Sequence, residues 1–157
     1  MKIVLYSIGK PHEGYVKEGI EEFTKRIGRY YPVEWKILPP AKQTINTIES
    51  EVKKQESMTV LNALHKDDYL VLLDERGKQF SSVQLASFIE SRANSSVKQL
   101  IFLIGGAFGV DESVAARAGF VWSFSQLVFP HQLMRLMLAE QLYRACTIIR
   151  NEKYHHQ

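Results

Sequence analysis

The sequence of 157 residues contains one cysteine, Cys146, and no C-x-x-C pair. An internal disulfide and a zinc knuckle are therefore excluded. No apolar run approaches the roughly 20 residues that span a bilayer; three glycines interrupt the longest, residues 100–110. The start, MKIVLYSIGKPH, has too short an apolar stretch for a signal peptide and no small-residue cleavage site. We expect a soluble cytoplasmic protein with no membrane partner.

The chain also lacks a strong charge of either sign. Lys and Arg number 20 against 17 Asp and Glu, and most basic residues lie near acidic ones, as in EEFTKR. Proteins that hold nucleic acid by charge alone usually carry a dense basic face or tail. The net charge of +3 permits a nucleic-acid partner without requiring one. The length and the 45% hydrophobic content are those of one globular domain, residues 1–157.

Short apolar, β-branched runs alternate along the chain with segments that have the periodicity of amphipathic helices. The runs typical of strands are residues 2–8, 33–38, 69–73, 100–104 and 120–124. The segments typical of helices are residues 15–27, 45–64, 81–89, 111–117 and 131–149. This alternation predicts an α/β fold with a mainly parallel sheet that helices cover on both faces.

Three local features refine this prediction. Ser81 and Gln84 have the spacing of a capping box at the start of a helix. Pro130 suits the first turn of the helix predicted at 131–149. The polar stretch 41–57 is the segment that we expect to be most mobile.

Glycines follow the fourth predicted strand in the segment LIFLIGGAFGVDES. Glycine after a strand lets a ligand approach the backbone, and the next helix offers free N–H groups. The spacing is not G-x-G-x-x-G, the acidic ribose partner about 20 residues later is missing, and G-x-x-x-x-G-K-[ST] does not occur. Two interpretations stay open at Gly105: a ligand-binding turn, or a tight turn that serves packing.

An unusually apolar connection, WSFSQLVFPHQLMR, precedes the last predicted helix. Loops are normally polar, whereas this one contains Leu127, Val128 and Phe129 in succession. The backbone groups of such a loop need hydrogen-bond partners, either within the protein or on a ligand. The loop therefore either encloses an adenine ring and bonds its edge, or is a buried crossover without a ligand.

The helix predicted at 131–149 carries two apolar stripes. One holds Met134, Leu138, Leu142, Ala145 and Ile149; the other holds Leu133, Leu136 and Met137 together with Glu140 and Arg144. Two apolar faces on one helix indicate burial on both sides, and in so small a domain we expect the second face to contact a second copy, giving a homodimer. Glu140 and Arg144, four residues apart, are either an ordinary helix ion pair or a more buried one.

The chain ends in NEKYHHQ, where Tyr154, His155 and His156 are consecutive. Taken alone, such an end is most often inert or the remainder of a tag. Combined with LIGGAFG and SFSQLVFPHQLMRLMLAEQLYRA, it resembles the small SPOUT-class methyltransferases of the RlmH type. The resemblance covers essentially the whole chain, including the LDERGK segment and the order of S-x-S-x-x-x-x-P-H, E-x-x-Y-R-A and Y-H.

This resemblance implies an α/β knot, in which the C-terminal segment threads through a loop as a trefoil. It implies methylation of N3 of a pseudouridine in helix 69 of 23S rRNA, on assembled ribosomes, with S-adenosyl-L-methionine as cofactor and no metal. The implied cofactor-binding residues are Leu73, Gly105, Phe124, Ser125, Gln126, Leu127, Val128 and Phe129.

The resemblance also implies catalytic roles for the tail and the last helix. His155 would accept the N3 proton, since an imidazole titrates near neutral pH. Tyr154 would stack on or bond the base, Arg144 would stabilise the uridine anion or a phosphate, and Glu140 would orient Arg144. Exchanging the roles of Tyr154 and His155 fits the sequence almost as well. Two rivals are a methyltransferase acting on a tRNA and a ribosome-associated binding protein without catalysis.

Overall fold

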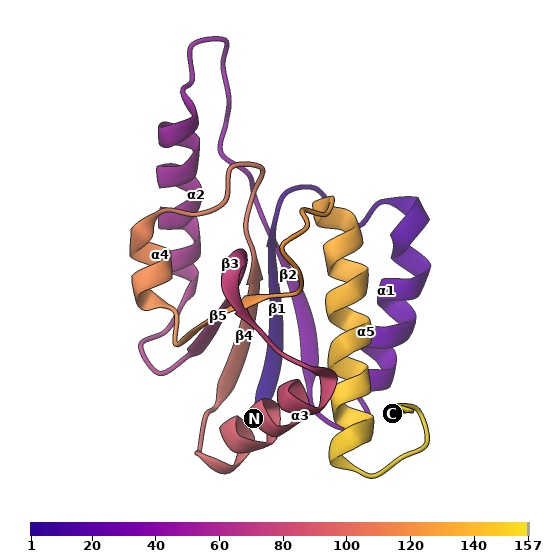
Figure 1. The fold of residues 1–157 in the computed structure, drawn as a ribbon. Helices are drawn as coiled ribbons and strands as arrows, with labels where there is room; N and C mark the ends of the chain where they lie inside the picture. The colour runs from indigo at the N-terminus through magenta and orange to yellow at the C-terminus, as the bar shows by residue number, and fades with distance from the viewer. Residues whose placement is uncertain (157) are drawn as a thin grey trace.

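The computed structural model describes residues 1–156. Five strands form one sheet in the order β2-β1-β4-β3-β5, with every pairing parallel (Figure 1). The strands are β1 (Lys2–Ile8), β2 (Val33–Leu38), β3 (Tyr69–Gln79), β4 (Gln99–Ile104) and β5 (Phe120–Ser123). The helices are α1 (Gly14–Ile27), α2 (Glu49–Ala63), α3 (Ser82–Asn94), α4 (Glu112–Arg117) and α5 (His131–Ile149). The predicted α/β class and parallel sheet are confirmed.

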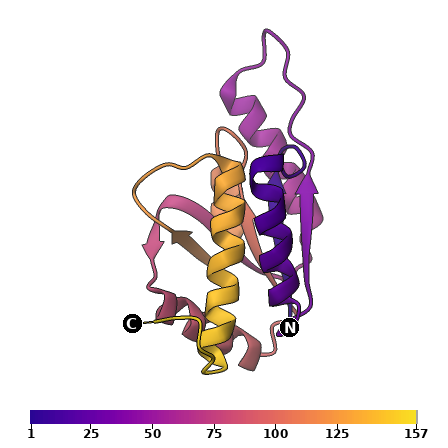
Figure 2. The same cartoon turned by 90° about the vertical axis from the view of Figure 1, so that its right-hand side faces the viewer.

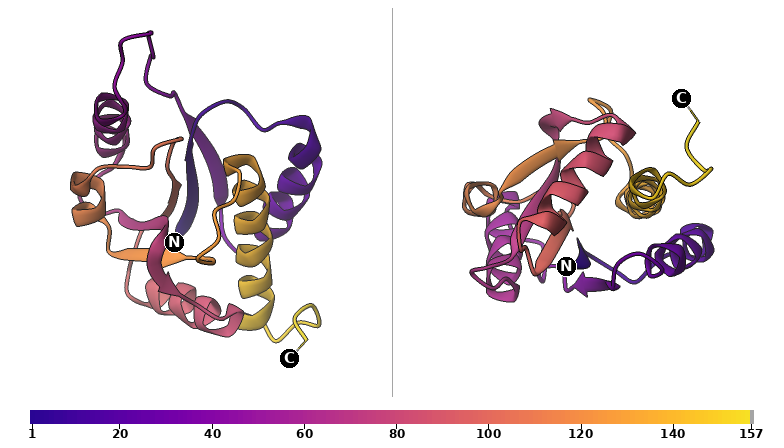
Figure 3. Two further views of the ribbon diagram at one scale, coloured as in Figure 1. Left: turned by 45° about the horizontal axis from the view of Figure 1, so that its top comes forward. Right: turned by 90° about the horizontal axis from the view of Figure 1, so that it is seen from below.

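Helices cover both faces of the sheet. Helices α1, α3 and α5 pack on one face and α2 and α4 on the other, and Figure 3 includes a view from below. In β1, Ile3 and Leu5 belong to the first core, whereas Val4 and Tyr6 belong to the second. Burial on both faces is the reason that the central strands read as continuous apolar runs.

Helix α5 lies beside α1, as Figure 2 shows, and also contacts α3. It begins at His131 and ends at Ile149, as predicted, and Pro130 occupies the N-cap rather than the first turn. The capping box at the start of α3 is confirmed: Ser81 Oγ accepts from Gln84 N–H, and Gln84 Oε1 accepts from Ser81 N–H.

Three predicted boundaries are wrong: the start of α2, the end of β3, and the end of α3, which continues to Asn94 instead of stopping at residue 89. Helix α2 begins at Glu49, because Ile45 and Ile48 lie in the preceding loop with their side chains exposed to solvent. The second half of the stretch predicted to be mobile, residues 49–57, is helical and buries Val52, Glu56 and Ser57, so that prediction is wrong there.

Strand β3 was predicted to end at Leu73 but continues to Gln79. Leu73 and Lys78 both align with Trp122 of β5, so residues 74–77 form a long bulge between two stretches of pairing. The threading of a knot, implied by the resemblance, stays a prediction. Within residues 1–156 no helix is both long and apolar enough to cross a membrane.

Candidate active site

A cavity of about 350 Å³ opens at the carboxyl end of β4, beside residues 72–76 in the middle of β3. Its walls come from the glycine segment after β4, the β3 bulge, the connection between β5 and α5, and the first turns of α2 and α5. Ligands of open parallel sheets bind at this edge, and the volume lies in the usual range for small-molecule sites, about 300–1,000 Å³.

The glycine segment is held in place by α2. The Asp111 N–H donates to Ser57 Oγ at 2.9 Å, and the Gly109 N–H donates to the Gly106 carbonyl at 3.0 Å. A Cβ on Gly106 would lie 2.4 Å from the nearest carboxylate oxygen of Glu56, so any other residue fits there only if the Glu56 carboxylate or the segment moves. Gly109 has a φ of 75°, which also favours glycine. The glycines thus serve close packing and, at the same time, line a cavity.

The connection between β5 and α5 keeps backbone groups free beside the cavity. The Leu127 N–H donates to Ser125 Oγ at 3.1 Å, but the backbone groups of Gln126, Val128 and Phe129 make no hydrogen bond within the described residues. The Leu127 and Val128 side chains are 69% and 80% exposed. This connection is therefore not a buried crossover, and it offers donors and acceptors to a ligand.

One residue of the cavity wall has a buried donor without a partner among the described residues. The Trp122 Nε1–H is buried without an acceptor in the described part of the chain, and Trp122 lines the cavity. Of the eight residues predicted to bind the cofactor, Gln126 does not line this cavity. The other seven do: Leu73, Gly105, Phe124, Ser125, Leu127, Val128 and Phe129. The structure gathers them from three separate segments, and their role in binding stays a prediction.

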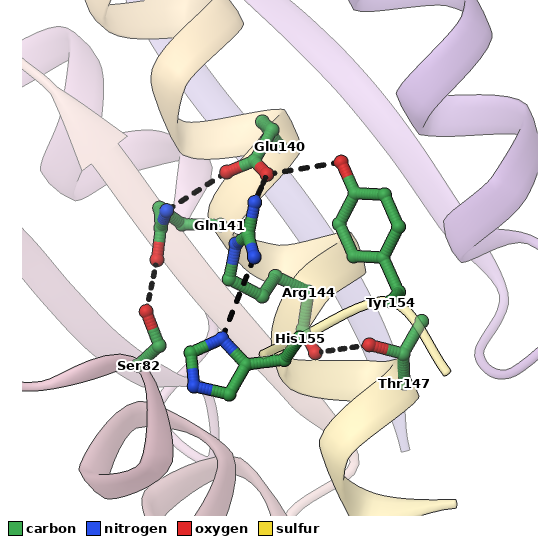
Figure 4. A network of polar contacts seen from close by, with 7 residues as sticks. All are labelled: Ser82, Glu140, Gln141, Arg144, Thr147, Tyr154 and His155. Carbon is green, nitrogen blue, oxygen red and sulfur yellow. Dashed lines mark hydrogen bonds and ion pairs between the residues drawn. The ribbon is translucent and has the colours of Figure 1, made fainter. Parts of the chain in front are cut away.

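The predicted catalytic residues form one polar network on α5 and the tail (Figure 4). Glu140 Oε1 accepts from Arg144 Nε at 3.0 Å and from the Tyr154 hydroxyl at 3.1 Å. The Arg144 guanidinium lies 4.7 Å from the centre of the Tyr154 ring and contacts His155 Nδ1 at 3.4 Å. Glu140 and Arg144 are about one-quarter exposed or less, at 20% and 25%, so the pair is more sheltered than an ordinary surface ion pair.

Further hydrogen bonds connect this network to α3. Gln141 Nε2 donates to the other Glu140 oxygen at 2.8 Å, and Gln141 Oε1 accepts from Ser82 Oγ at 2.9 Å. Burial, followed by the charge of Glu140, raises the pKa of the Tyr154 phenol. The phenol is therefore protonated at neutral pH and acts as a hydrogen-bond donor.

The two predicted sets of residues do not meet within one copy. None of Glu140, Arg144, Tyr154 and His155 lines the cavity at the sheet edge. Glu140 instead lines a second, more apolar cavity of about 430 Å³ along α5, together with Leu136 and Met137 of the second apolar stripe. Trp122 and Phe124 line both cavities, so the two sites are neighbours that share a wall.

Three buried charged residues escaped the sequence analysis, and Arg135 and Glu56 are more deeply buried than the third, Asp68. Arg135 is 1% exposed; its Nε donates to Ser7 Oγ at 2.8 Å and its Nη1 to the Lys10 carbonyl at 2.9 Å. Glu56 is 3% exposed, and its Oε2 has no partner among the described residues. Both residues lie at helical spacing from buried apolar residues: Arg135 is three residues before Leu138, and Glu56 is four residues after Val52. This spacing places them on the buried face of their helices, and it is the sequence signal that could have identified them.

Comparison with known proteins shows what these features belong to. A family model described as "Predicted SPOUT methyltransferase" matches residues 1–155. The chain belongs to the SPOUT methyltransferase family. Three curated relatives, each named "Ribosomal RNA large subunit methyltransferase H", match over nearly the full length. They come from Parabacteroides distasonis (43% identical, 100% of both chains), Cytophaga hutchinsonii (44%, 99% of this chain and 100% of the relative) and Trichlorobacter lovleyi (41%, 99% and 100%).

As a SPOUT methyltransferase, the chain is an enzyme that has to hold a methyl donor and an acceptor side by side. The cavity at the sheet edge and the Glu140–Arg144 network are two sites of suitable chemistry for these tasks. Within residues 1–156 no three His, Cys, Asp or Glu side chains are grouped to bind a metal ion.

Proposed function

We propose that the protein methylates N3 of a pseudouridine in helix 69 of 23S rRNA, acting on assembled ribosomes with S-adenosyl-L-methionine as methyl donor. The observation that carries the proposal is the full-length similarity to relatives named as large-subunit rRNA methyltransferases. The Glu140–Arg144 network beside a cavity with unpaired backbone groups supports it chemically.

The cavity at the sheet edge suits an adenosyl cofactor. Leu127, Val128 and Phe129 provide an apolar wall for an adenine ring, and the unpaired backbone groups of the same segment can bond its edge. When bound, S-adenosyl-L-methionine supplies an electrophilic methyl group on a sulfonium.

His155 is better suited than Tyr154 to accept the N3 proton. Tyr154 donates to Glu140, and the raised pKa of its phenol keeps it protonated. His155 Nδ1 acts as an acceptor toward Arg144, and at 3.4 Å this contact is weak enough to exchange for one with a substrate N–H. Arg144, oriented by Glu140, then stabilises the negative charge that develops on the pyrimidine. Tyr154 offers its ring for stacking on the base.

The working enzyme in this proposal is a homodimer. The second stripe of α5 borders an open apolar cavity, a surface that a partner subunit would cover. Within one copy the cofactor cavity and the tail network are lined by different residues, so a second copy that brings its tail to the first copy's cavity completes the site. Sedimentation should give a particle of two 18.1 kDa chains; a monomer at working concentration would overturn the dimer.

The test of the activity is methyl transfer from labelled S-adenosyl-L-methionine to intact ribosomes, separated subunits and bulk tRNA in parallel. Label that appears with ribosomes and maps to a pseudouridine of the large-subunit RNA supports the proposal. Label in tRNA would replace the substrate. Cofactor binding with no label in any RNA would favour a ribosome-associated binding protein without catalysis.

A further inference from the structure

The wall of the sheet-edge cavity opposite the apolar connection is charged. It is formed by Glu49 and Lys53 on the first turns of α2 and by Asp74, Glu75 and Arg76 of the β3 bulge. Figure 1 shows α2 and the β5–α5 connection on opposite sides of the carboxyl end of β4. A cavity with one apolar and one charged wall suits a ligand that has an apolar part and a charged part.

The bulge that carries part of this wall is a fixed structure. A Cβ on Gly77 would lie 2.6 Å from the Val121 carbonyl oxygen, so the return of the chain into β5 pairing requires glycine. Asp74 accepts from the Arg76 backbone N–H at 2.9 Å and from Arg76 Nε and Nη2 at 2.9 and 2.8 Å. The bulge therefore presents Arg76 in one orientation, and bulges often aim side chains in this way beside active sites.

Two cationic groups on this wall remain able to bind an anion. The Arg76 side chain is 80% exposed and its Nη1 makes no hydrogen bond with the described residues. Lys53 forms no ion pair within residues 1–156. The pKa of the Asp74 carboxyl is lowered mainly by its hydrogen bonds with Arg76, and the charge of Lys53 lowers it further. Glu49 and Glu75, the acidic members of the wall, are likewise without an ion-pair partner in that range.

We propose that this charged wall binds the amino-acid end of the adenosyl cofactor, with Lys53 and Arg76 holding its α-carboxylate and Glu49 and Glu75 facing its α-ammonium. The inference rests on the proposed function, since it assigns the polar end of the same ligand. A zwitterionic end group opposite an adenine matches the charged and apolar walls of the cavity, and a guanidinium with a free N–H edge suits a carboxylate.

The test compares two ligands that differ only in this end group. S-Adenosylhomocysteine carries the amino-acid moiety, whereas 5′-methylthioadenosine lacks it, and calorimetric titration gives Kd for each without turnover. For Lys53→Met and for Arg76→Gln we expect the Kd of S-adenosylhomocysteine to rise about tenfold and that of methylthioadenosine to change less than twofold. Lys54→Met is the matched control, because Lys54 is exposed on the same helix and does not line the cavity.

Three results would overturn the inference. An equal loss for both ligands would mean that the two side chains only shape the cavity. An unchanged Kd for S-adenosylhomocysteine in both variants would mean that they make no contact with the end group. If the unaltered protein bound neither ligand, the proposed function would fail and this inference with it. The first two results, in contrast, would overturn only the inference and leave the proposed function standing.

Discussion

Replacing Gly106 by alanine tests whether Glu56 sets the shape of the glycine segment. The added Cβ would lie 2.4 and 2.6 Å from the two carboxylate oxygens of Glu56 and 2.9 Å from its Cδ. Real Cβ atoms do not approach other atoms this closely, so either the carboxylate or the segment has to move. The Glu56 side chain is only 3% exposed, and the next residue of α2, Ser57, is hydrogen-bonded to Asp111. The Glu56 carboxylate therefore has little room to move away from residue 106.

Overpacking of a buried site costs about 1–3 kcal/mol of the free energy of unfolding, and we expect Gly106→Ala to fall in that range. Urea denaturation measures this cost directly. Gly14→Ala is the control, since a Cβ there meets nothing within 4 Å and the change is expected to be neutral or slightly stabilising. Because Gly105 lines the cavity, Gly106→Ala should also weaken binding of S-adenosylhomocysteine.

A double-mutant cycle isolates the contact itself. In a Glu56→Ala background the space beside residue 106 is vacated, so Gly106→Ala should cost at least about 1 kcal/mol less than in the parent protein. The same cost in both backgrounds would refute the reasoning, because the penalty would then not arise from Glu56. No measurable cost in the parent would refute the geometry on which it rests.

Three further predictions concern buried polar groups. Burial raises the pKa of Glu56, so the folded state binds the proton of this carboxyl more tightly than the unfolded state does. The free energy of unfolding, compared with that of Glu56→Gln, should therefore fall as the pH rises from about 4.3 through the raised pKa of Glu56. Urea midpoints measured from pH 4 to 8 that show the opposite trend would contradict this. Arg135→Met leaves Ser7 Oγ and the Lys10 carbonyl without their donor, so the free energy of unfolding should drop by about 3 kcal/mol in urea denaturation; a loss below about 1 kcal/mol would contradict it. Burial raises the pKa of Cys146 to about 12, so a thiol reagent at pH 7 should label it only on unfolding, and rapid labelling of the folded protein would be the contrary result.

The sequence predicts the central sheet and α5 well because their signals are physical consequences of burial. Strands covered on both faces are apolar throughout, and α5 repeats its core residues at helical spacing. The start of α2 could not be predicted in this way. Ile45 and Ile48 have helical spacing relative to Val52, yet they lie in an exposed loop whose turn is held by Thr44 and Thr47.

The extension of β3 was missed for the opposite reason. Residues 74–78, DERGK, are polar and show no alternation, and the pairing depends on a bulge that only the contact between Gly77 and Val121 reveals. The charged wall of the cavity was missed with it. The network of Glu140 with Arg144 was foreseen from their spacing, but its contacts with Tyr154 and His155 depend on how the tail folds back over α5, which no local pattern encodes.

The central claim is that the tail network performs proton transfer while the sheet-edge cavity holds the cofactor. The measurement that tests it most directly is the double variant Tyr154→Ala/His155→Ala, with cofactor binding and single-turnover methyl transfer to intact ribosomes measured on the same sample. We predict a Kd for S-adenosylhomocysteine within twofold of the parent and a transfer rate at least about 100-fold lower, the usual range for loss of a general base. Transfer at the parent rate would contradict the account.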